Sequence, residues 1–331
     1  MPGVGVITNP RSRVNRRDPT VASRLAWLIG SRGAAAATTS IDDLYRAAEE
    51  FKKADVDVLG INGGDGTIHH TLTAFVKTYA DQPLPAIAIL RGGTMNTIAN
   101  SLGLRGRPPK LLFELVDKHH TGTLVTREQR LLEIRDSERT HYGFIFGNGL
   151  LYNFLDAYYS SGKPSPWEAV KLLARACVSA LIGGSLARDL NRRLKARVTV
   201  DGDTWAREDF MTVAASTVEQ IGLGFKPFYR VKERPDAFPI LGIHCASPFE
   251  LAGQLPRIFR GRPMRRDKVI DMVGAHLSFE ADELPYIIDG DTYRATGHLD
   301  VRLGPLLRLV ELTGRATQDF DETTARLPEP A

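Results

Sequence analysis

A glycine-rich segment, Gly63-Gly64-Asp65-Gly66-Thr67, separates an apolar run at residues 56–61 from a stretch with helical periodicity. The apolar run predicts a buried strand, so the segment lies where a strand turns directly into a helix. Glycine permits a sharp turn and lets the backbone come close to another group. The order of strand, glycine loop and helix predicts an α/β domain with this loop at the carboxyl end of a parallel strand.

The first 120 residues alternate between strand and helix signals. We expect strands at residues 4–8, 34–38, 56–62 and 86–90. We expect helices at residues 19–30, 41–53, 67–79, 95–102 and 110–118, with Ser40 as the N-cap of the second. This rhythm is typical of a parallel sheet with helices on both faces.

Beyond residue 122 the pattern changes to many strands joined by turns. Strand signals occur at residues 123–135, 142–147, 195–200, 209–215, 238–245, 269–280, 286–289 and 299–303, with a helical stretch at 166–191. Such a series predicts an antiparallel β-sandwich. We therefore expect an α/β domain at 1–122, a sandwich domain at 123–320 whose last residues can pack back on the first, and a flexible tail at 321–331.

Composition narrows the class of protein. The start of the sequence has no secretory-signal pattern, no run of about 18 uncharged apolar residues occurs, and the only cysteines are Cys177 and Cys245. These features predict a cytoplasmic protein. A net charge of +4 is too small to indicate nucleic-acid binding. Basic clusters at residues 11–17, 188–197 and 257–268 suit anionic phosphates or an anionic membrane surface, with 257–268 as the preferred membrane contact, and an ordinary solvated surface is the alternative.

The glycine segment is the strongest chemical signal. Its glycines expose backbone N–H groups, and the following helix adds a partial positive charge, so the loop suits a phosphate. Asp65 would repel that anion unless it holds a metal ion or moves a proton. A second loop, Arg91-Gly92-Gly93-Thr94-Met95-Asn96, also joins a strand to a helix. We expect the two loops side by side, with Thr94 and Asn96 capping the helix and contacting a nucleotide.

A third signal is Asp289-Gly290-Asp291, which follows an apolar strand. Acids two apart on a strand face the same side, so the pair is a candidate for binding Mg²⁺ or for accepting a proton from a hydroxyl. Asp-Gly is also a common hairpin turn, and we assign Asp201-Gly202-Asp203 to that role.

These motifs together resemble the diacylglycerol kinase catalytic family, which includes sphingosine and ceramide kinases and bacterial lipid kinases. The resemblance rests on Asn9-Pro10, the first glycine loop, residues 92–99 (GGTMNTIA) and the late Asp-Gly-Asp, in the family's order. It implies an NAD-kinase-like first domain and an ATP-dependent lipid kinase that uses Mg²⁺. The nucleotide would then be held by Asn9, Thr39, Gly63, Gly64, Asp65, Gly66, Thr67, Gly93, Thr94 and Asn96.

By the same resemblance, Asp291 would accept the proton of the lipid hydroxyl. Asp65 would assist it through Mg²⁺ or as a second base, with Asp289 as a further candidate for the metal. The chain departs from the family pattern at His70, Thr97 and Asp291, where the family has Glu, Asp and Glu. It also has few acids at 223–239, where the family holds a structural metal.

Two other functions remain open. NAD kinases share the first glycine loop, but their usual Asn-Glu dipeptide after the second strand is missing here. A non-catalytic nucleotide-binding regulator is suggested by the replaced acids. As partners we expect a lipid substrate and the inner membrane surface, with a homodimer left open. The apolar stretch at 167–186, with Leu172, Leu173, Val178, Leu181 and Ile182, could line an acyl cleft, meet the bilayer or pack on the sandwich.

Overall fold

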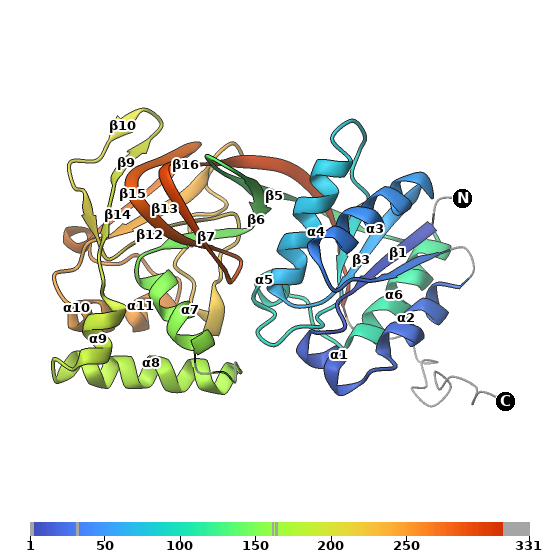
Figure 1. Cartoon of the computed structure of the whole chain (residues 1–331), viewed down its shortest axis with the longest axis horizontal. Helices are drawn as coiled ribbons and strands as arrows, with labels where there is room; N and C mark the ends of the chain where they lie inside the picture. The colour runs from blue at the N-terminus through green and yellow to red at the C-terminus, as the bar shows by residue number, and fades with distance from the viewer. Residues whose placement is uncertain (1–2, 31–32, 161, 163–164, 314–331) are drawn as a thin grey trace. The chain divides into compact units, whose positions relative to one another are not determined.

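The chain forms two compact units in the computed structural model, which describes residues 3–30, 33–160, 162 and 165–313. Unit 1 comprises Met1–Gln129 and Leu306–Ala331, and unit 2 comprises Arg130–Pro305. The chain leaves unit 1 within strand β5 (Thr126–Asp136) and returns to it within β16 (Asp291–Val310) (Figure 1). The expected division at residue 122 therefore lies seven residues before the start of unit 2.

Unit 1 is built on a parallel sheet with the order β4-β3-β1-β2. Its strands are β1 (Gly3–Thr8), β2 (Ala34–Ala37), β3 (Val56–Asn62) and β4 (Ala86–Ile89). β1, β3 and β4 are mostly buried apolar runs, as expected for strands covered on both faces, whereas the edge strand β2 alternates between half-buried and exposed residues. The end of β16 joins the sheet beside β4, where Leu309 pairs with Ile87 in parallel. The expected return of the last residues to the first domain thus begins at residue 306, and the predicted tail at 321–331 lies outside the described residues.

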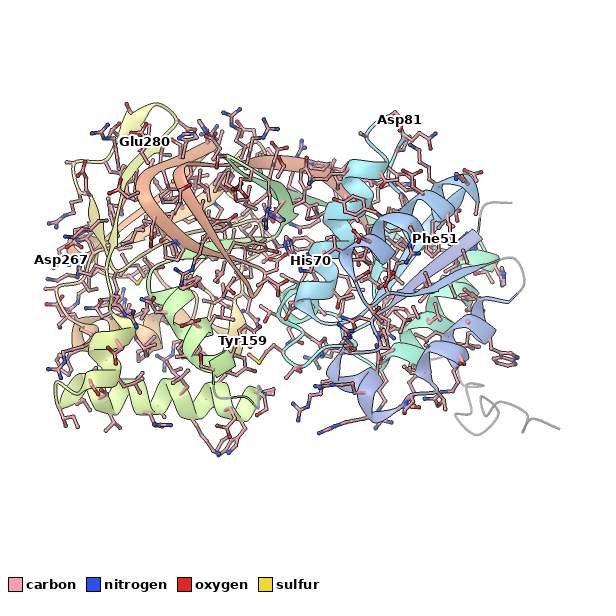
Figure 2. The ribbon with its side chains drawn as sticks, viewed as in Figure 1. Phe51, His70, Asp81, Tyr159, Asp267 and Glu280 are labelled. Carbon is pink, nitrogen blue, oxygen red and sulfur yellow. The ribbon has the colours of Figure 1, made fainter. Side chains whose placement is uncertain are left out.

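Helices cover the sheet of unit 1 on both faces. They are α1 (Arg13–Arg17), α2 (Val21–Ile29), α3 (Ile41–Lys53), α4 (Asp65–Thr78), α5 (Thr97–Ser101) and α6 (Pro108–His120). In Figure 1, α3 and α4 lie together on one face, and α2 and α6 on the other. Ser40 starts α3 as predicted, because its hydroxyl and the Asp43 carboxylate form a reciprocal capping box. Phe51, labelled in Figure 2, packs over Gly5 of β1, where a Cβ would come within 2.6 Å of its ring.

Unit 2 is mostly antiparallel. Besides the ends of β5 and β16 that lie in it, its strands are β6 (Thr140–Gly143), β7 (Ile145–Asn148), β8 (Leu194–Lys195), β9 (Arg197–Val200), β10 (Asp203–Thr204), β11 (Asp209–Phe210), β12 (Thr212–Ser216), β13 (Phe238–Ile243), β14 (Val269–Gly274) and β15 (His276–Ile288). The first half of β15 pairs with β9 and its second half with β7, across a register shift between Ala281 and Leu284. This shared strand lets two ladders enclose one aromatic core, whose largest members are Phe146, Phe210, Phe238, Phe279 and Tyr286.

The helices of unit 2 differ from the expectation. They are α7 (Leu150–Ser160), α8 (Pro166–Leu181), α9 (Ser185–Leu190), α10 (Pro248–Ala252) and α11 (Leu255–Phe259). The predicted helix at 166–191 is two helices, because Gly183 adopts a positive φ of 65° and ends the first. The sequence analysis missed α7, α10 and α11. Within the described residues, no helix combines the length and apolar character needed to cross a bilayer.

The Asp201-Gly202 segment is a hairpin turn, as predicted. Val200 pairs with Asp203 across it, and Asp201 and Gly202 have φ values of 52° and 94°. Two consecutive residues with positive φ are typical of the type I′ turn. The predicted strand at 269–280 is in fact two strands, β14 and the start of β15.

Tyr79 at the end of α4 is a buried phenol that stacks on Phe75, with ring centroids 5.6 Å apart. Its hydroxyl has no hydrogen-bond partner among the described residues. Burial, reinforced by the charges of Asp55 and Glu49, raises the pKa of Tyr79 from 10.0 to about 12. The folded state therefore holds this proton more tightly than the unfolded chain does.

We predict that Tyr79→Phe leaves stability near neutral pH unchanged or slightly higher, because no hydrogen bond is lost. The wild type should lose stability as the pH rises from 10 towards 12, since the pKa is raised on folding. The variant should lose less over the same interval. Urea unfolding at a series of pH values measures both slopes, and equal slopes would contradict the prediction.

Candidate functional site in unit 1

Two glycine loops meet at the carboxyl edge of the parallel sheet in unit 1. One follows β3 and opens α4, and the other follows β4 and precedes α5. A Cβ on Gly93 would lie 2.3 Å from the Cα of Gly64, and one on Gly92 would lie 2.4 Å from Oδ1 of Asn62. Any larger residue at these positions would push the loops apart. The prediction that the two loops lie side by side is confirmed.

Three asparagines fix the loop after β1 against the first glycine loop. Asn9 donates from Nδ2 to Oγ1 of Thr67 at 2.8 Å. Asn15 donates to the backbone oxygen of Asn9 at 2.7 Å, and Asn62 donates to Oδ1 of Asn15 at 3.2 Å. Asn15 and Asn62 are almost fully buried, so this network rigidifies the edge of the sheet.

The sequence analysis named Asn9 but missed Asn15 and Asn62. Asn62 carries a detectable signal, since it is a polar residue at the end of a largely apolar strand, directly before Gly63. Asn15 carries none, because an asparagine among arginines reads as an exposed loop residue.

Asp65 links the two loops by hydrogen bonds. As the first residue of α4, it accepts from the backbone N–H groups of Thr97 and Ile98, both at 3.0 Å. These are the first two amides of α5, so Asp65 provides the cap of that helix. The expectation that Thr94 and Asn96 cap it is therefore wrong.

Asn96 has a different role, which follows from its backbone conformation. It is left-handed, with φ of 48°, a conformation that asparagine adopts more readily than most residues. Its side chain turns back to Gly93, accepting from the N–H at 3.0 Å and donating to the carbonyl at 3.2 Å. Asn96 thus closes the second glycine loop on itself.

The start of α4 can receive an anion. Gly64 is its N-cap and supplies no side chain, and the first intrahelical bond runs from Ile68 N–H to the Gly64 carbonyl at 3.0 Å. The N–H groups before Ile68 therefore have no acceptor within the helix, and they carry the positive end of its dipole. Gly63, Gly64 and Gly66 keep this end accessible to a phosphate. The residues present fit a nucleotide phosphate group.

The remaining predicted nucleotide contacts lie on the same unit. Thr39 follows β2 at the same edge of the sheet, and its hydroxyl donates to the Asp43 carboxylate at 3.0 Å. The Thr39 backbone N–H, together with Arg46, holds the pKa of Asp43 well below its usual range. Thr94 is half-buried in the second glycine loop.

We predict that Asp65→Ala destabilises the protein by about 1–3 kcal/mol, because the amides of Thr97 and Ile98 lose their acceptor. Asp65→Asn should cost less, since its amide oxygen still accepts. The matched control is Asp42→Ala, which removes another first-turn carboxylate but affects only a helix dipole, with an expected loss of about 0.5 kcal/mol. Urea denaturation of the three variants is the measurement. Equal stability of Asp65→Ala and Asp42→Ala would contradict the capping role.

The Asp289-Gly290-Asp291 motif of unit 2 is a hairpin turn between β15 and β16. Ile288 pairs with Asp291 across it, and Asp289 and Gly290 have φ values of 50° and 102°. The expectation that the two acids share one strand face is wrong, because Asp289 lies in the turn. Asp291 is the half-buried first residue of β16.

Asp289 is buried, and its carboxylate is bound to backbone amides. It accepts from Phe144 N–H at 3.0 Å and from Ile145 N–H at 2.8 Å. A Cβ on Gly143 would come within 2.8 Å of the same carboxylate. Tyr159, labelled in Figure 2, donates to the Gly290 carbonyl at 3.0 Å. These contacts fix the turn and so position Asp291.

The residues proposed as metal ligands differ in how well they suit a metal ion. Asp289 does not fit a Mg²⁺ ligand, because it is buried and both of its oxygens accept backbone hydrogen bonds. Asp65 is half-buried, and its carboxylate oxygens are of the ligand type that Mg²⁺ prefers. The acids at 223–239 do not fit a structural metal either. Glu233 is bound to Arg230 at 2.6 Å, and Asp236 to Arg234 at 2.6 Å.

We predict that Asp289→Ala destabilises the protein by at least about 2 kcal/mol, because two buried amides lose their acceptor. Asp201→Ala is a matched control: it removes the same residue from the same turn type at nearly the same φ, where the carboxylate also accepts two amides. Asp201 is exposed, so water can replace it and the loss should be smaller. Chemical denaturation with and without a chelator provides the test. Equal losses, or a wild-type midpoint that falls on chelation, would contradict the structural role.

Comparison with known proteins identifies the class. Residues 3–126 match the family model of the diacylglycerol kinase catalytic domain. A protein of Escherichia coli O127:H6 named "Probable lipid kinase YegS" is 40% identical over 62 residues, which is 19% of this chain and 20% of that protein. The match thus spans about a fifth of the length of the curated relatives.

Solved structures agree in fold. A diacylglycerol kinase from Bacillus anthracis superposes with a TM-score of 0.61 at 14% identity, covering 93% of this chain and 96% of the other. Yeast NADH kinase, solved with NADH, gives a TM-score of 0.50 at 12% identity, covering 98% and 86%. The family match covers residues 3–126 alone, and both units share the fold of a bacterial diacylglycerol kinase and of yeast NADH kinase.

Proposed function

We propose that this protein transfers the γ-phosphoryl group of ATP to the hydroxyl of a lipid such as diacylglycerol, ceramide or a sphingoid base. The observation that carries the proposal is the direct packing of the two glycine loops at the start of α4. This packing leaves backbone amides and a helix dipole as the ligands for phosphate. Phosphoryl transfer depends mainly on such positioning and charge stabilisation.

Individual residues of unit 1 take roles that follow from their contacts. Asn9 and Thr67 hold each other and shape the first loop, while Asp65 and Asn96 shape the second. Mg²⁺ accompanying ATP would neutralise charge that develops on the phosphates. Asp65 is the candidate to orient that ion, since its carboxylate lies in the first turn of α4, beside the proposed phosphate site, and carboxylate oxygens are ligands that Mg²⁺ prefers.

Asp291 is the candidate proton acceptor for the lipid hydroxyl. The rigid turn formed by Asp289 and Gly290 holds it in one place, which a general base requires. An aspartate in place of the family's glutamate shortens the reach by one methylene group. Help from a general base is typically worth about 10²–10⁴-fold in rate.

A lipid acceptor is favoured over NAD by the sequence and the family match. Residues 92–99 and the late Asp-Gly-acid motif are typical of the lipid branch, and residues 3–126 match the diacylglycerol kinase domain. The likeness to NADH kinase is one of fold. NAD phosphorylation and nucleotide binding without transfer remain as alternatives for the experiment.

We predict transfer of labelled γ-phosphate from ATP to at least one lipid in mixed micelles containing diacylglycerol, ceramide and a sphingoid base, with NAD as a separate acceptor. Asp291→Asn should lower kcat by about 10²–10⁴-fold with ATP affinity unchanged, because only the proton acceptor is lost. Gly93→Ala should abolish ATP binding, since its Cβ would collide with Gly64.

Gly253→Ala is the control for glycine substitution, because a Cβ there has no contact closer than 3.4 Å. Labelling of NAD alone would replace the proposal by NAD kinase. ATP binding without transfer to any acceptor would favour the regulator. Full activity of Asp291→Asn would remove the proton-acceptor role and leave the kinase intact.

A further inference from the structure

Helix α8 of unit 2 carries a continuous exposed apolar stripe. Its start is well defined, since the Ser165 hydroxyl accepts from Glu168 N–H at 3.2 Å and Pro166 occupies the first turn. At 100° per residue, the exposed positions fall within roughly 140° of the helix circumference. The apolar members of the stripe are Trp167, Val170, Ala174, Val178, Leu181 and the C-cap residue Ile182.

This exposure is specific to one face. Ala169 and Ser179 are buried on the opposite side, and Leu172 and Leu173 are half-buried there. The helix is therefore packed on unit 2 through that side, where α7, α9 and α10 are its neighbours (Figure 1). Of the five apolar residues singled out in the sequence, Leu172 and Leu173 belong to the packed side, and Val178, Leu181 and Ile182 belong to the exposed stripe.

The residues of the stripe are unusually large for a solvated helix face. Trp167 is 64% exposed, Leu181 66% and Ile182 77%. Scattered single apolar residues on a surface need no explanation, but a continuous set on one helix indicates an interaction site. Tryptophan in particular favours the boundary between water and lipid.

Positive charge borders the stripe. Exposed Lys171 and Arg175 lie along one edge of it, about 40° and 80° around the helix from Trp167. Glu168, the one acid of α8, is bound to Lys171 at 2.9 Å. The neighbouring α9 adds Arg188 and Asp189, which cancel each other in charge.

A second exposed set lies on the adjoining helices. Phe249 of α10, a neighbour of α8, is exposed, as is Phe259 of α11. Exposed Arg257 and Arg260 accompany them, and Glu250 of α10 is in an ion pair with Lys268 at 3.5 Å. The basic segment 257–268, expected from the sequence to contact a membrane, thus includes the exposed Phe259 of α11.

We propose that the α8 surface, formed by Trp167, Val170, Ala174, Val178, Leu181 and Ile182 with Lys171 and Arg175, docks on an anionic lipid bilayer. The apolar stripe enters the interface while the two cations meet lipid phosphates, as in helices that lie in the plane of a membrane. A helix of 16 residues in this orientation is anchored without crossing the bilayer. The inference deepens the proposed lipid kinase by naming its membrane contact, yet binding can be measured without catalysis.

The charge of the α8 surface distinguishes between two possible occupants, a bilayer and a second copy of the chain. A two-fold contact through this surface would bring Arg175 of both copies into one interface, while Lys171 and Glu168 of each copy neutralise one another and leave each surface with a net positive charge. An anionic membrane offers the opposite charge, worth about 1 kcal/mol or fivefold in affinity for each cation near it. The bilayer is therefore the favoured occupant.

The test is sedimentation of the full chain with phosphatidylcholine vesicles that contain or lack phosphatidylglycerol. The wild type should bind the anionic vesicles preferentially. Trp167→Ala combined with Leu181→Ser should weaken binding at least about tenfold, because the buried apolar area is lost. Lys171→Gln combined with Arg175→Gln should weaken it by roughly 25-fold and remove the preference for anionic lipid.

Controls on unit 1 match these variants in type and exposure. Trp27→Ala removes a tryptophan that is 57% exposed on α2, and Lys53→Gln with Arg105→Gln removes two exposed cations. Both should bind vesicles like the wild type. As a direct probe of insertion, vesicles should shift tryptophan emission to the blue in Trp27→Phe but not in Trp167→Phe.

Three results would overturn the inference. They are unchanged vesicle binding by both α8 variants, binding that ignores phosphatidylglycerol, and a concentration-dependent dimer that Trp167→Ala with Leu181→Ser dissociates. Phosphate transfer to a short-chain, water-soluble diacylglycerol separates this inference from the proposed function. If docking through α8 is wrong and the kinase function is right, the α8 variants phosphorylate both the soluble and the vesicle-borne acceptor as well as the wild type does. If the kinase function is wrong and docking through α8 is right, the α8 variants bind vesicles more weakly than the wild type, and neither acceptor is labelled.

Discussion

The carboxylate of Asp65 holds the candidate site of unit 1 in shape. It opens α4 and at the same time caps α5, so the two helices that follow the glycine loops start from one shared residue. This link brings Gly64 and Gly93 so close together that a Cβ on Gly93 would lie 2.3 Å from the Cα of Gly64. The amides at the start of α4 then remain for an anion, because the acid in the loop already has its own donors. Part of the reason for an aspartate beside a phosphate site is thus its bond to the amides of Thr97 and Ile98.

In unit 2, aspartate carboxylates also accept hydrogen bonds from backbone amides, and there they hold turns. Asp289 and Asp201 each start an Asp-Gly turn and each bind two backbone amides of a neighbouring strand. Burial separates them, because only Asp289 lies out of reach of water. The turn at Asp289 therefore positions Asp291, and the residue proposed to accept a proton stands two residues after a buried carboxylate that is held by backbone amides. The same unit carries the exposed apolar stripe of α8, which suits the proposed contact with a bilayer.

Much of the fold could be predicted from local patterns. The parallel sheet of unit 1 followed from apolar runs between glycine loops, and the start of α3 followed from Ser40 and its capping acids. The antiparallel character of unit 2 was predictable from its turns. Helices α10 and α11 were not, because five-residue helices show too little periodicity to separate from loops. The site was predictable where glycine spacing reports a strand end, and unpredictable where an asparagine such as Asn15 gains its role from a strand distant in sequence.

The sequence by itself determined the two glycine loops, their order along the chain and the acids that accompany them, because these depend on residue type and on neighbours a few positions away. Tertiary structure alone decided what each acid does. Asp65 caps a helix 32 residues further along the chain, and Asp289 binds amides 144 and 145 residues before it. It also decided which apolar residues of α8 are packed and which are exposed, since periodicity defines the faces of a helix and only the packed neighbours show which face is covered.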